Sequence, residues 1–175
     1  MISVICSTNR KESNSAIFAK SISGLLTEMG QENRMLDLID LPDDFVFNNE
    51  VYGIHNDRLL QIQDKHVTEA EKFIFVIPEY NGSFPGVVKA FIDSFSPSRI
   101  HNKKALLIGI SSGRAGNLRG LEHFTGIMNY LRVTVSPFKP SIAFCHNLVE
   151  EEKGNINDEK TISLLSGACE NFIQF

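Results

Sequence analysis

Residues 73–95 read FIFVIPEYNGSFPGVVKAFIDSF, and they carry the clearest strand–loop–helix signal in the chain. The apolar start of this segment is β-branched or aromatic, which is typical of a strand that is buried on both faces of a sheet. Beyond the loop, apolar residues recur on one helix face at Val88, Phe91 and Phe95. Pro85 suits the first turn of that helix. In a parallel sheet such a loop lies at the carboxyl end of its strand, where ligands of open α/β folds bind.

The alternation of strand and helix continues on both sides of this segment. We predict strands at residues 2–6, 34–38, 73–77, 105–110 and 133–144. Helices are expected over about residues 18–29, 57–71, 86–95, 118–131 and 162–172. The last strand contains Pro137 and Pro140, which favours an edge position or a bulge over the centre of a sheet.

Two segments between these elements show no clear periodicity. Residues 40–56 combine Pro42 with several acidic and amide residues, and we expect a surface loop or lid there. The apolar residues of this loop, Phe45, Val46 and Phe47, are expected to be exposed. Residues 147–157 are predicted to form a charged loop.

Five strands that alternate with helices predict an α/β fold with helices on both faces of one parallel sheet. The natural topology is a doubly wound, flavodoxin-like sheet of five strands in the order 2-1-3-4-5. Its switch point lies between strands 1 and 3, so the loops after these strands are expected to lie side by side. At 175 residues, the chain is expected to be a single α/β domain covering residues 1–175.

Composition narrows the class of partner. The chain is 42% hydrophobic and 22% charged, as in ordinary soluble globular proteins. A formal net charge of −4 offers no electrostatic footprint for nucleic acid. No apolar run approaches the roughly 20 residues that a membrane span needs, so no membrane partner is expected. The first residues lack the basic region of a signal peptide and lead directly into a strand, so we expect a cytoplasmic protein.

Cysteines and histidines predict neither a metal site nor a nucleophilic catalyst. Cys6, Cys145 and Cys169 lack Cys-x-x-Cys spacing, so neither a disulfide framework nor a zinc site is indicated. Cys145 and His146 are adjacent, and on a strand such neighbours point to opposite faces, so we discount them as a catalytic pair. The five histidines show no metal-ligand spacing, and surface or capping roles are expected for them.

The loop after the first strand, residues 7–15, is dense in hydroxyl and amide groups and leads into a helix. A helix N-terminus offers free N–H groups and the positive end of the helix dipole, which attract a phosphate. Arg10 adds a cation that can grip phosphate oxygens with two parallel hydrogen bonds. Neither a Walker P-loop nor a Rossmann Gly-x-Gly-x-x-Gly turn is present. The alternative is that these polar residues only cap the helix.

The amino-acid sequences of three loops resemble motifs of one protein family. Residues 78–89 closely resemble the flavin-contacting loop of the NADPH-dependent FMN reductase family, Pro-Glu-Tyr-Asn-x-Ser-x-Pro-Gly-x-x-Lys. The first loop is similar to the family's FMN-phosphate loop, Ser/Thr-x-Arg followed by Ser-x-Ser or Ser-Asn-Ser. Residues 111–119 are similar to its Ser-x-Gly-Gly-Arg-x-Gly-Gly-x-Leu-Arg segment. The chain departs from the pattern at Ser7, where many members have a Ser-Gly or Gly-Ser step, and at Ala115, which replaces a glycine.

This resemblance implies a cofactor and a set of residues that hold it. The cofactor is FMN, with NADPH or NADH as cosubstrate. The phosphate would meet the first loop, the ring would meet Tyr80 and nearby backbone, and its pyrimidine end would meet the third loop. The implied binding residues are Ser7, Thr8, Arg10, Ser13, Asn14, Ser15, Pro78, Glu79, Tyr80, Asn81, Gly82, Ser111, Ser112, Gly113 and Arg114. The alternative for residues 80–82 is a plain turn, since Asn-Gly is a strong turn signal.

The resemblance also implies an activity. It is an NAD(P)H oxidoreductase that passes hydride from nicotinamide to bound FMN and then electrons to a quinone, azo, metal or flavin acceptor. No catalytic side chain is expected, because the cofactor carries the chemistry. A homodimer or homotetramer is implied as well. The alternatives are a flavodoxin-type electron carrier and a family member that has lost catalysis. The carrier is disfavoured because flavodoxins as a family lack an arginine in the phosphate loop and often stack the flavin with Trp, which this chain lacks.

Overall fold

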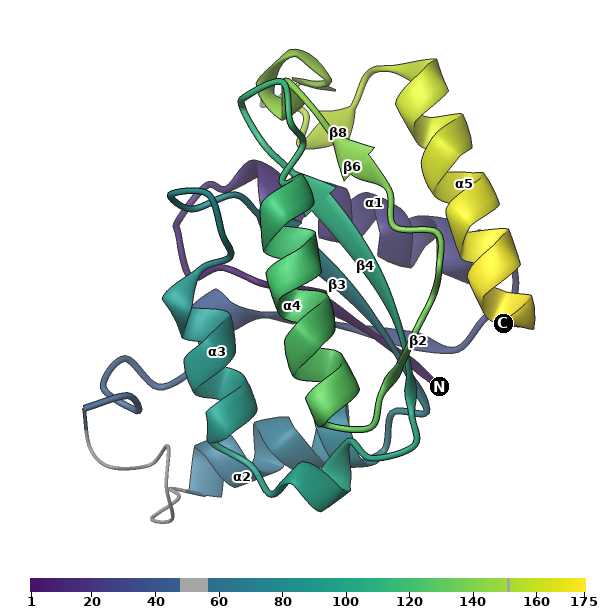
Figure 1. Cartoon of the computed structure of the whole chain (residues 1–175). Coiled ribbons are helices and arrows are strands. Elements are labelled where there is room, and N and C mark those ends of the chain that lie inside the picture. The colour runs from purple at the N-terminus through teal and green to yellow at the C-terminus, as the bar shows by residue number, and fades with distance from the viewer. Residues whose placement is uncertain (48–56, 151) are drawn as a thin grey trace.

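The computed structural model describes residues 1–47, 57–150 and 152–175. Its sheet contains the parallel strands β1 (Ile2–Cys6), β2 (Asn33–Asp37), β3 (Lys72–Pro78) and β4 (Lys104–Ile110). They lie in the order β2-β1-β3-β4, and β5 (Thr134–Val135) follows β4 at the edge, which confirms the predicted topology (Figure 1). β1 and β3 are neighbours although a helix, a strand and a further helix separate them along the chain. The loops that follow these two strands therefore leave the sheet side by side.

The last predicted strand, over 133–144, is interrupted at Pro137 and Pro140 as expected, and only its two ends pair with the sheet. Two short strands, β5 (Thr134–Val135) and β6 (Ser141–Ile142), pair in parallel with opposite ends of β4. Pro137 and Pro140 lie between them. Proline has no N–H for the ladder, so the chain leaves the sheet at this edge and returns to it.

Helices cover both faces of the sheet (Figure 1). α1 (Asn14–Glu28) and α5 (Glu159–Gln174) pack on one face over a core that includes Val4, Val76 and Ile108. α2 (Asp57–Gln63), α3 (Gly86–Asp93) and α4 (Leu118–Tyr130) pack on the other over a core that includes Ile5 and Phe75. Successive strand residues thus enter opposite cores, which explains why these strands read as continuous apolar runs.

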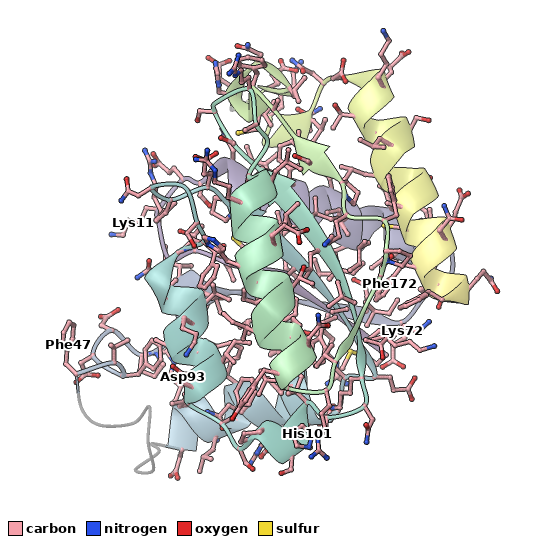
Figure 2. All side chains as sticks on the ribbon, viewed as in Figure 1. Lys11, Phe47, Lys72, Asp93, His101 and Phe172 are labelled. Carbon is pink, nitrogen blue, oxygen red and sulfur yellow. The ribbon has the colours of Figure 1, made fainter. Side chains whose placement is uncertain are left out.

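The end of α5 is fastened to the sheet. Lys72 donates hydrogen bonds to the carbonyls of Phe172 and Ile173, at 3.1 and 2.9 Å. Its ammonium group also lies 5.5 Å from the centre of the Phe172 ring, and Figure 2 labels both residues. A cation at the carbonyl end of a helix satisfies free acceptors and opposes the helix dipole.

Three local predictions need correction. The helix predicted over 57–71 is α-helical only in α2 and continues as a π-helix, η2 (Asp64–Thr68), in which His66 is buried at 6% exposure, not at the surface. The predicted loop 147–157 contains an antiparallel pair of strands, β7 (Val149–Glu150) and β8 (Asn155–Ile156). Three short 3₁₀ helices, η1 (Leu38–Asp40), η3 (Pro97–Arg99) and η4 (Cys145–Asn147), complete the described elements.

The segment after β2 is only partly what the sequence suggested. Phe45 is 3% exposed and belongs to the core under α2 and α3, so its predicted exposure is wrong. Val46 and Phe47 are exposed as expected, at 42% and 87%, and Figure 2 shows Phe47 extending away from the body of the molecule. The rest of the predicted lid, residues 48–56, lies outside the described residues. Among the described helices, none has the length and apolar character that crossing a membrane requires.

Candidate functional site

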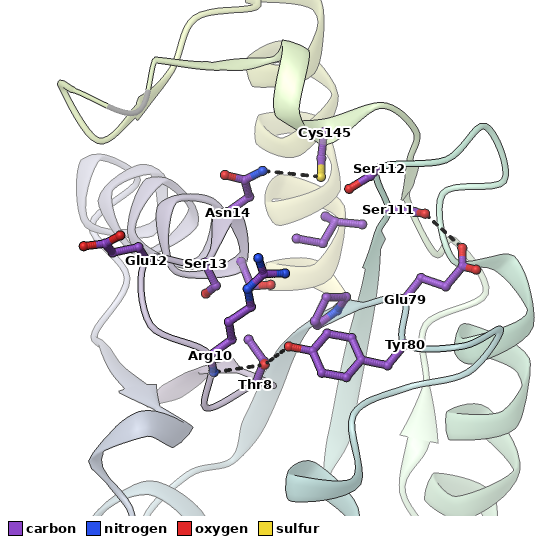
Figure 3. Close-up of a pocket in the computed structure, with 13 residues that line it drawn as sticks. Thr8, Arg10, Glu12, Ser13, Asn14, Glu79, Tyr80, Ser111, Ser112 and Cys145 are labelled. Carbon is purple, nitrogen blue, oxygen red and sulfur yellow. Dashed lines mark hydrogen bonds between the residues drawn. The ribbon is translucent and has the colours of Figure 1, made fainter.

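Three loops meet around a cleft of about 210 Å³ at the carboxyl end of the sheet (Figure 3). They follow β1 and β3, which flank the switch point, and β4, which lies beside β3. The residues that line the cleft are Thr8, Arg10, Glu12, Ser13, Asn14, Ser15, Pro78, Glu79, Tyr80, Ile110, Ser111, Ser112 and Cys145. Most of the residues predicted from the sequence are therefore brought together in one place.

The first wall of the cleft is the loop after β1 and the start of α1. Ser13 is the N-cap of this helix, and its hydroxyl accepts a hydrogen bond of 3.3 Å from the backbone N–H of Ala16. The backbone N–H of Arg10 donates to the Thr8 hydroxyl at 3.3 Å. Among the residues that the structure describes, the Arg10 side chain takes part in no ion pair. A cation and a helix N-terminus thus face the same space, which suits an anion.

The second wall is the loop after β3, which forms a tight two-residue turn. Asn81 and Gly82 have φ of 50° and 78°. Tyr80 and Ser83, on either side of them, exchange two backbone hydrogen bonds of 3.0 Å each. Positive φ at both central positions defines the type I′ turn that Asn-Gly favours, so the turn alternative in the sequence is correct as a description of the backbone. The turn is nonetheless joined to the first wall of the cleft, because the Tyr80 and Thr8 hydroxyls share a hydrogen bond of 2.7 Å.

The third wall is the loop after β4. The Ser111 hydroxyl donates to Glu79 Oε2 at 2.9 Å and accepts from the backbone N–H of Gly113 at 3.0 Å. At the end of this loop Asn117 is buried in the left-handed conformation, and its amide donates to the Ile77 carbonyl at 2.9 Å. Asn117 therefore joins the third loop to the strand before the second loop. The sequence does not reveal this role, because nothing local distinguishes a buried loop asparagine from an exposed one.

Five predicted residues do not line the cleft. The Ser7 side chain is fully buried and its hydroxyl donates to the Ile5 carbonyl at 3.4 Å, which leaves it no contact with the cleft. The other four, Asn81, Gly82, Gly113 and Arg114, lie in the turn and loop that border it.

Three cleft residues were not predicted: Glu12, Ile110 and Cys145. Cys145 is 4% exposed, and the Asn14 amide donates to its sulfur at 3.8 Å. Burial raises the pKa of the Cys145 thiol, so it stays protonated at neutral pH. Cys145 begins η4 and does not lie in a strand, contrary to expectation, and its neighbour His146 is exposed. Cys145 reaches the cleft because β6 pairs with the end of β4, and the residues after β6 therefore lie beside the cleft. This pairing was not evident from the sequence, so Cys145 was not predicted.

Comparison with known proteins identifies the family. A model of the NADPH-dependent FMN reductase family matches residues 1–146, which contain all three loops of the cleft. The chain belongs to the NADPH-dependent FMN reductase family. This membership confirms the resemblance seen in the three loops. It also confirms the predicted enzyme class, an oxidoreductase, and the predicted cofactors, FMN and a nicotinamide dinucleotide.

Individual relatives of this reductase agree with the family. The chain is 27% identical to an NAD(P)H-dependent FMN reductase of Pseudomonas aeruginosa over 87% of this chain and 81% of that protein. It is 28% identical to a quinone reductase of Escherichia coli K12 over 95% and 89% of the two chains. A solved flavoenzyme from Paracoccus denitrificans, an NAD(P)H:acceptor oxidoreductase, superposes with a TM-score of 0.80 at 24% identity, covering 99% and 94% of the chains. An archaeal flavodoxin superposes with a TM-score of 0.66 at 12% identity, covering 99% and 97%, so the fold is flavodoxin-like.

Proposed function

We propose that the cleft binds FMN and that this reductase passes electrons from NAD(P)H to a small-molecule acceptor of the quinone type. The observation that carries the proposal is the convergence of Arg10 and the start of α1 with the turn after β3 in one cleft. A phosphate and a flat ring, the two ends of FMN, need these two kinds of surface side by side.

The hydrogen-bond donors at one end of the cleft suit the phosphate group of FMN. Hydroxyls of Thr8, Ser13 and Ser15 and the Asn14 amide surround the N-terminus of α1. These neutral donors, with the helix N–H groups and the Arg10 guanidinium, suit an anion in the cleft. Figure 3 shows the Glu12 carboxylate pointing away from Arg10, so Glu12 does not form an ion pair with the Arg10 guanidinium.

At the ring end, this chain supplies surface and backbone and no acid–base dyad. Backbone groups of residues 79–82 border the cleft, and Tyr80 lines it at 36% exposure. When bound, FMN supplies the hydride and electron-transfer chemistry, so the protein needs only to bind, orient and set the electrostatics. The Thr8–Tyr80 contact and the Ser111–Glu79 hydrogen bond hold the second loop against the first and third loops. Orientation of the second loop is therefore set by side chains from its two neighbours.

The acceptor proposal rests on the relatives. Those named above include a quinone reductase, and a further relative from Burkholderia, 24% identical over 91% of this chain and 87% of that protein, is a 2-hydroxy-1,4-benzoquinone reductase. Azo compounds, metal oxyanions and free flavins remain further acceptors to test. A cytoplasmic location fits the use of NAD(P)H and the three free, buried cysteines.

An absorbance spectrum of the purified protein tests the proposal. We expect oxidised-flavin bands that bleach when NADPH or NADH is added without oxygen and return when a benzoquinone is added. Bands that never bleach would indicate an electron carrier. Protein that takes up no FMN at micromolar concentration would contradict the proposal and indicate a member that has lost the cofactor.

Tyr80 provides a sharper prediction for the ring end. We expect Tyr80→Ala to slow flavin reduction by NADPH about fivefold, since it removes both the ring and a hydrogen bond of about 1 kcal/mol. Tyr80→Phe removes only the hydroxyl contact with Thr8 and should slow reduction less. Both variants should retain FMN, which is held mainly through its phosphate. Stopped-flow bleaching measures both rates, and wild-type rates in both variants would mean that the loop is only a turn.

For assembly, we propose a homodimer or a homotetramer that uses the groove between α3 and α4. This groove has a volume of about 460 Å³ and is lined by apolar residues such as Ile92, Ile127 and Tyr130. Tyr130 is 86% exposed beside these residues, so its ring adds to a contiguous apolar surface of the kind that marks an interaction site. Phe91 on α3 is buried in the chain's own core and is not available for this contact, whereas Phe95, at 6% exposure, forms part of the groove wall.

Light scattering tests the assembly. We expect a mass of at least twice the 19.6 kDa of one chain at micromolar concentration. Tyr130→Glu should shift the mass towards the monomer, because it puts a charge into an apolar contact. Leu164→Glu is the matched control, since Leu164 is exposed on α5 at the opposite face of the sheet. A monomeric mass for the wild type would contradict the proposal.

A further inference from the structure

The Asn81–Gly82 turn is tied to its surroundings on three sides. On one side, the Tyr80 hydroxyl contacts the Thr8 hydroxyl at 2.7 Å. On another, Glu79, directly before Tyr80, accepts from Ser111 at 2.9 Å. These two ties come from loops of the cleft itself. The third comes from α4, a helix that contributes no residue to the cleft lining.

α4 places two basic side chains one helical turn apart along this third side. His123 Nδ1 is 2.9 Å from the Ser83 hydroxyl, so the two share a hydrogen bond. A β-carbon added to Gly82 would lie 4.0 Å from Arg119 Nη1, which places the guanidinium beside the turn. Residues four apart lie on the same helix face, and this face of α4 is directed at the turn.

The turn needs such support. Tyr80 and Ser83 form a single isolated bridge, with no further ladder on either side of it. A lone two-residue hairpin is marginally stable in water, so its order depends on what holds its ends. Tyr80 is held by Thr8, and Ser83 is held by His123. Loss of either tie leaves one end of the bridge with fewer contacts.

We propose that His123 is a positioning residue for the turn that contacts the flavin. Through Ser83 it fixes the Asn81 and Gly82 backbone, and so sets the geometry of the ring end of the cleft without touching the cofactor. The flavin part of this inference rests on the proposed function, whereas the tie to the turn rests on the geometry alone. His123 is exposed, so its substitution is not expected to prevent folding.

The first test needs no cofactor. In the full chain without FMN, amide hydrogen exchange of Tyr80 and Ser83 is measured by NMR for the wild type, His123→Leu and His123→Asn. We expect His123→Leu to speed exchange about threefold, the lower part of the range for one hydrogen bond, because the pair is exposed. Asparagine can place a polar atom near the position of Nδ1, so His123→Asn should restore slow exchange. Unchanged exchange in His123→Leu would overturn the proposal.

The second test uses FMN-loaded protein, and light scattering checks that every variant has the wild-type mass, because His123 also lines the groove proposed for assembly. His123→Leu should slow flavin reduction by NADPH about threefold, with the Kd for FMN and the KM for NADPH unchanged, and Ser83→Ala should have the same effect. The double variant should be no slower than either single one, because all three lose the same bond. Glu122→Gln, which alters a neighbour that pairs with Lys139, is the control.

The outcomes separate the two claims. Additive losses in the double variant, or wild-type reduction in His123→Leu, would overturn the positioning role. Wild-type protein that takes up no FMN would overturn the proposed function and the flavin part of this inference, while faster exchange in His123→Leu would still support the tie between α4 and the turn.

Discussion

Replacing Arg10 with alanine is expected to weaken FMN binding by about 1.5–3 kcal/mol, the range for a hydrogen bond to a charged group. This corresponds to a roughly 10- to 150-fold higher Kd. The physical reason is that Arg10 is the cation among the residues that line the cleft, and it faces the N-terminus of α1. The other donors there are neutral and form hydrogen bonds with water almost as well as with phosphate. The charge of Arg10 therefore contributes the larger share of the binding free energy. Fluorescence titration of the flavin-free protein with FMN measures the change.

Three comparisons make the Arg10 experiment specific. Riboflavin lacks the phosphate, so its affinity should be equally poor for the wild type and for Arg10→Ala. Arg10→Lys keeps the charge but cannot form two parallel hydrogen bonds, so its affinity for FMN should fall between those of the wild type and Arg10→Ala. Lys11→Ala is the matched control, because Lys11 neighbours Arg10 and does not line the cleft. An FMN affinity that does not change in Arg10→Ala would mean that the phosphate binds elsewhere.

Mild acid is expected to destabilise the fold through His66. This side chain is 6% exposed in the π-helix η2, and Nδ1 has no hydrogen-bond partner among the described residues. Burial, with smaller contributions from Lys65 and Arg34, lowers the pKa of His66 from 6.5 to about 4. The unfolded chain therefore binds a proton before the folded chain does. Stability from this group is complete above pH 6.5 and is lost as the pH falls towards 4.

The difference between 6.5 and about 4 corresponds to roughly 3 kcal/mol of unfolding free energy, at 1.36 kcal/mol for each pH unit. Urea unfolding at pH 7.5 and pH 4.5 measures most of this loss. His66→Gln cannot titrate, so its stability should change much less between the two pH values. His146→Gln alters an exposed histidine and serves as the control. An equal loss in His66→Gln and the wild type would assign the acid sensitivity to carboxylates.

Much of the fold could be predicted because its signals are local. The run from Phe73 to Ile77 is apolar on both faces and rich in β-branched and aromatic residues, and it was correctly predicted as a buried strand. Pro85 and the apolar spacing after it marked the start of α3 correctly. The interruption of the last strand, at the edge of the sheet, could also be predicted, because Pro137 and Pro140 have no N–H to donate to a neighbouring strand. Its division into two short strands was not foreseeable, since that depends on where the chain returns to β4.

The sequence by itself determined the strand order, the position of the loops and the identity of most cleft residues. The strand order and the loop positions follow from the apolar pattern, and most cleft residues follow from the resemblance of the three loops to the reductase family. Residue chemistry supports that resemblance at Arg10, near a helix start, and at the Asn-Gly turn. Only the tertiary structure decided which side chains are buried and which loops are tied together. Phe45, His66 and Cys145 are buried by elements that are distant along the chain, and His123 reaches Ser83 only because α4 packs beside the second loop. Burial and long-range contacts depend on how elements pack, and no short stretch of sequence contains that information.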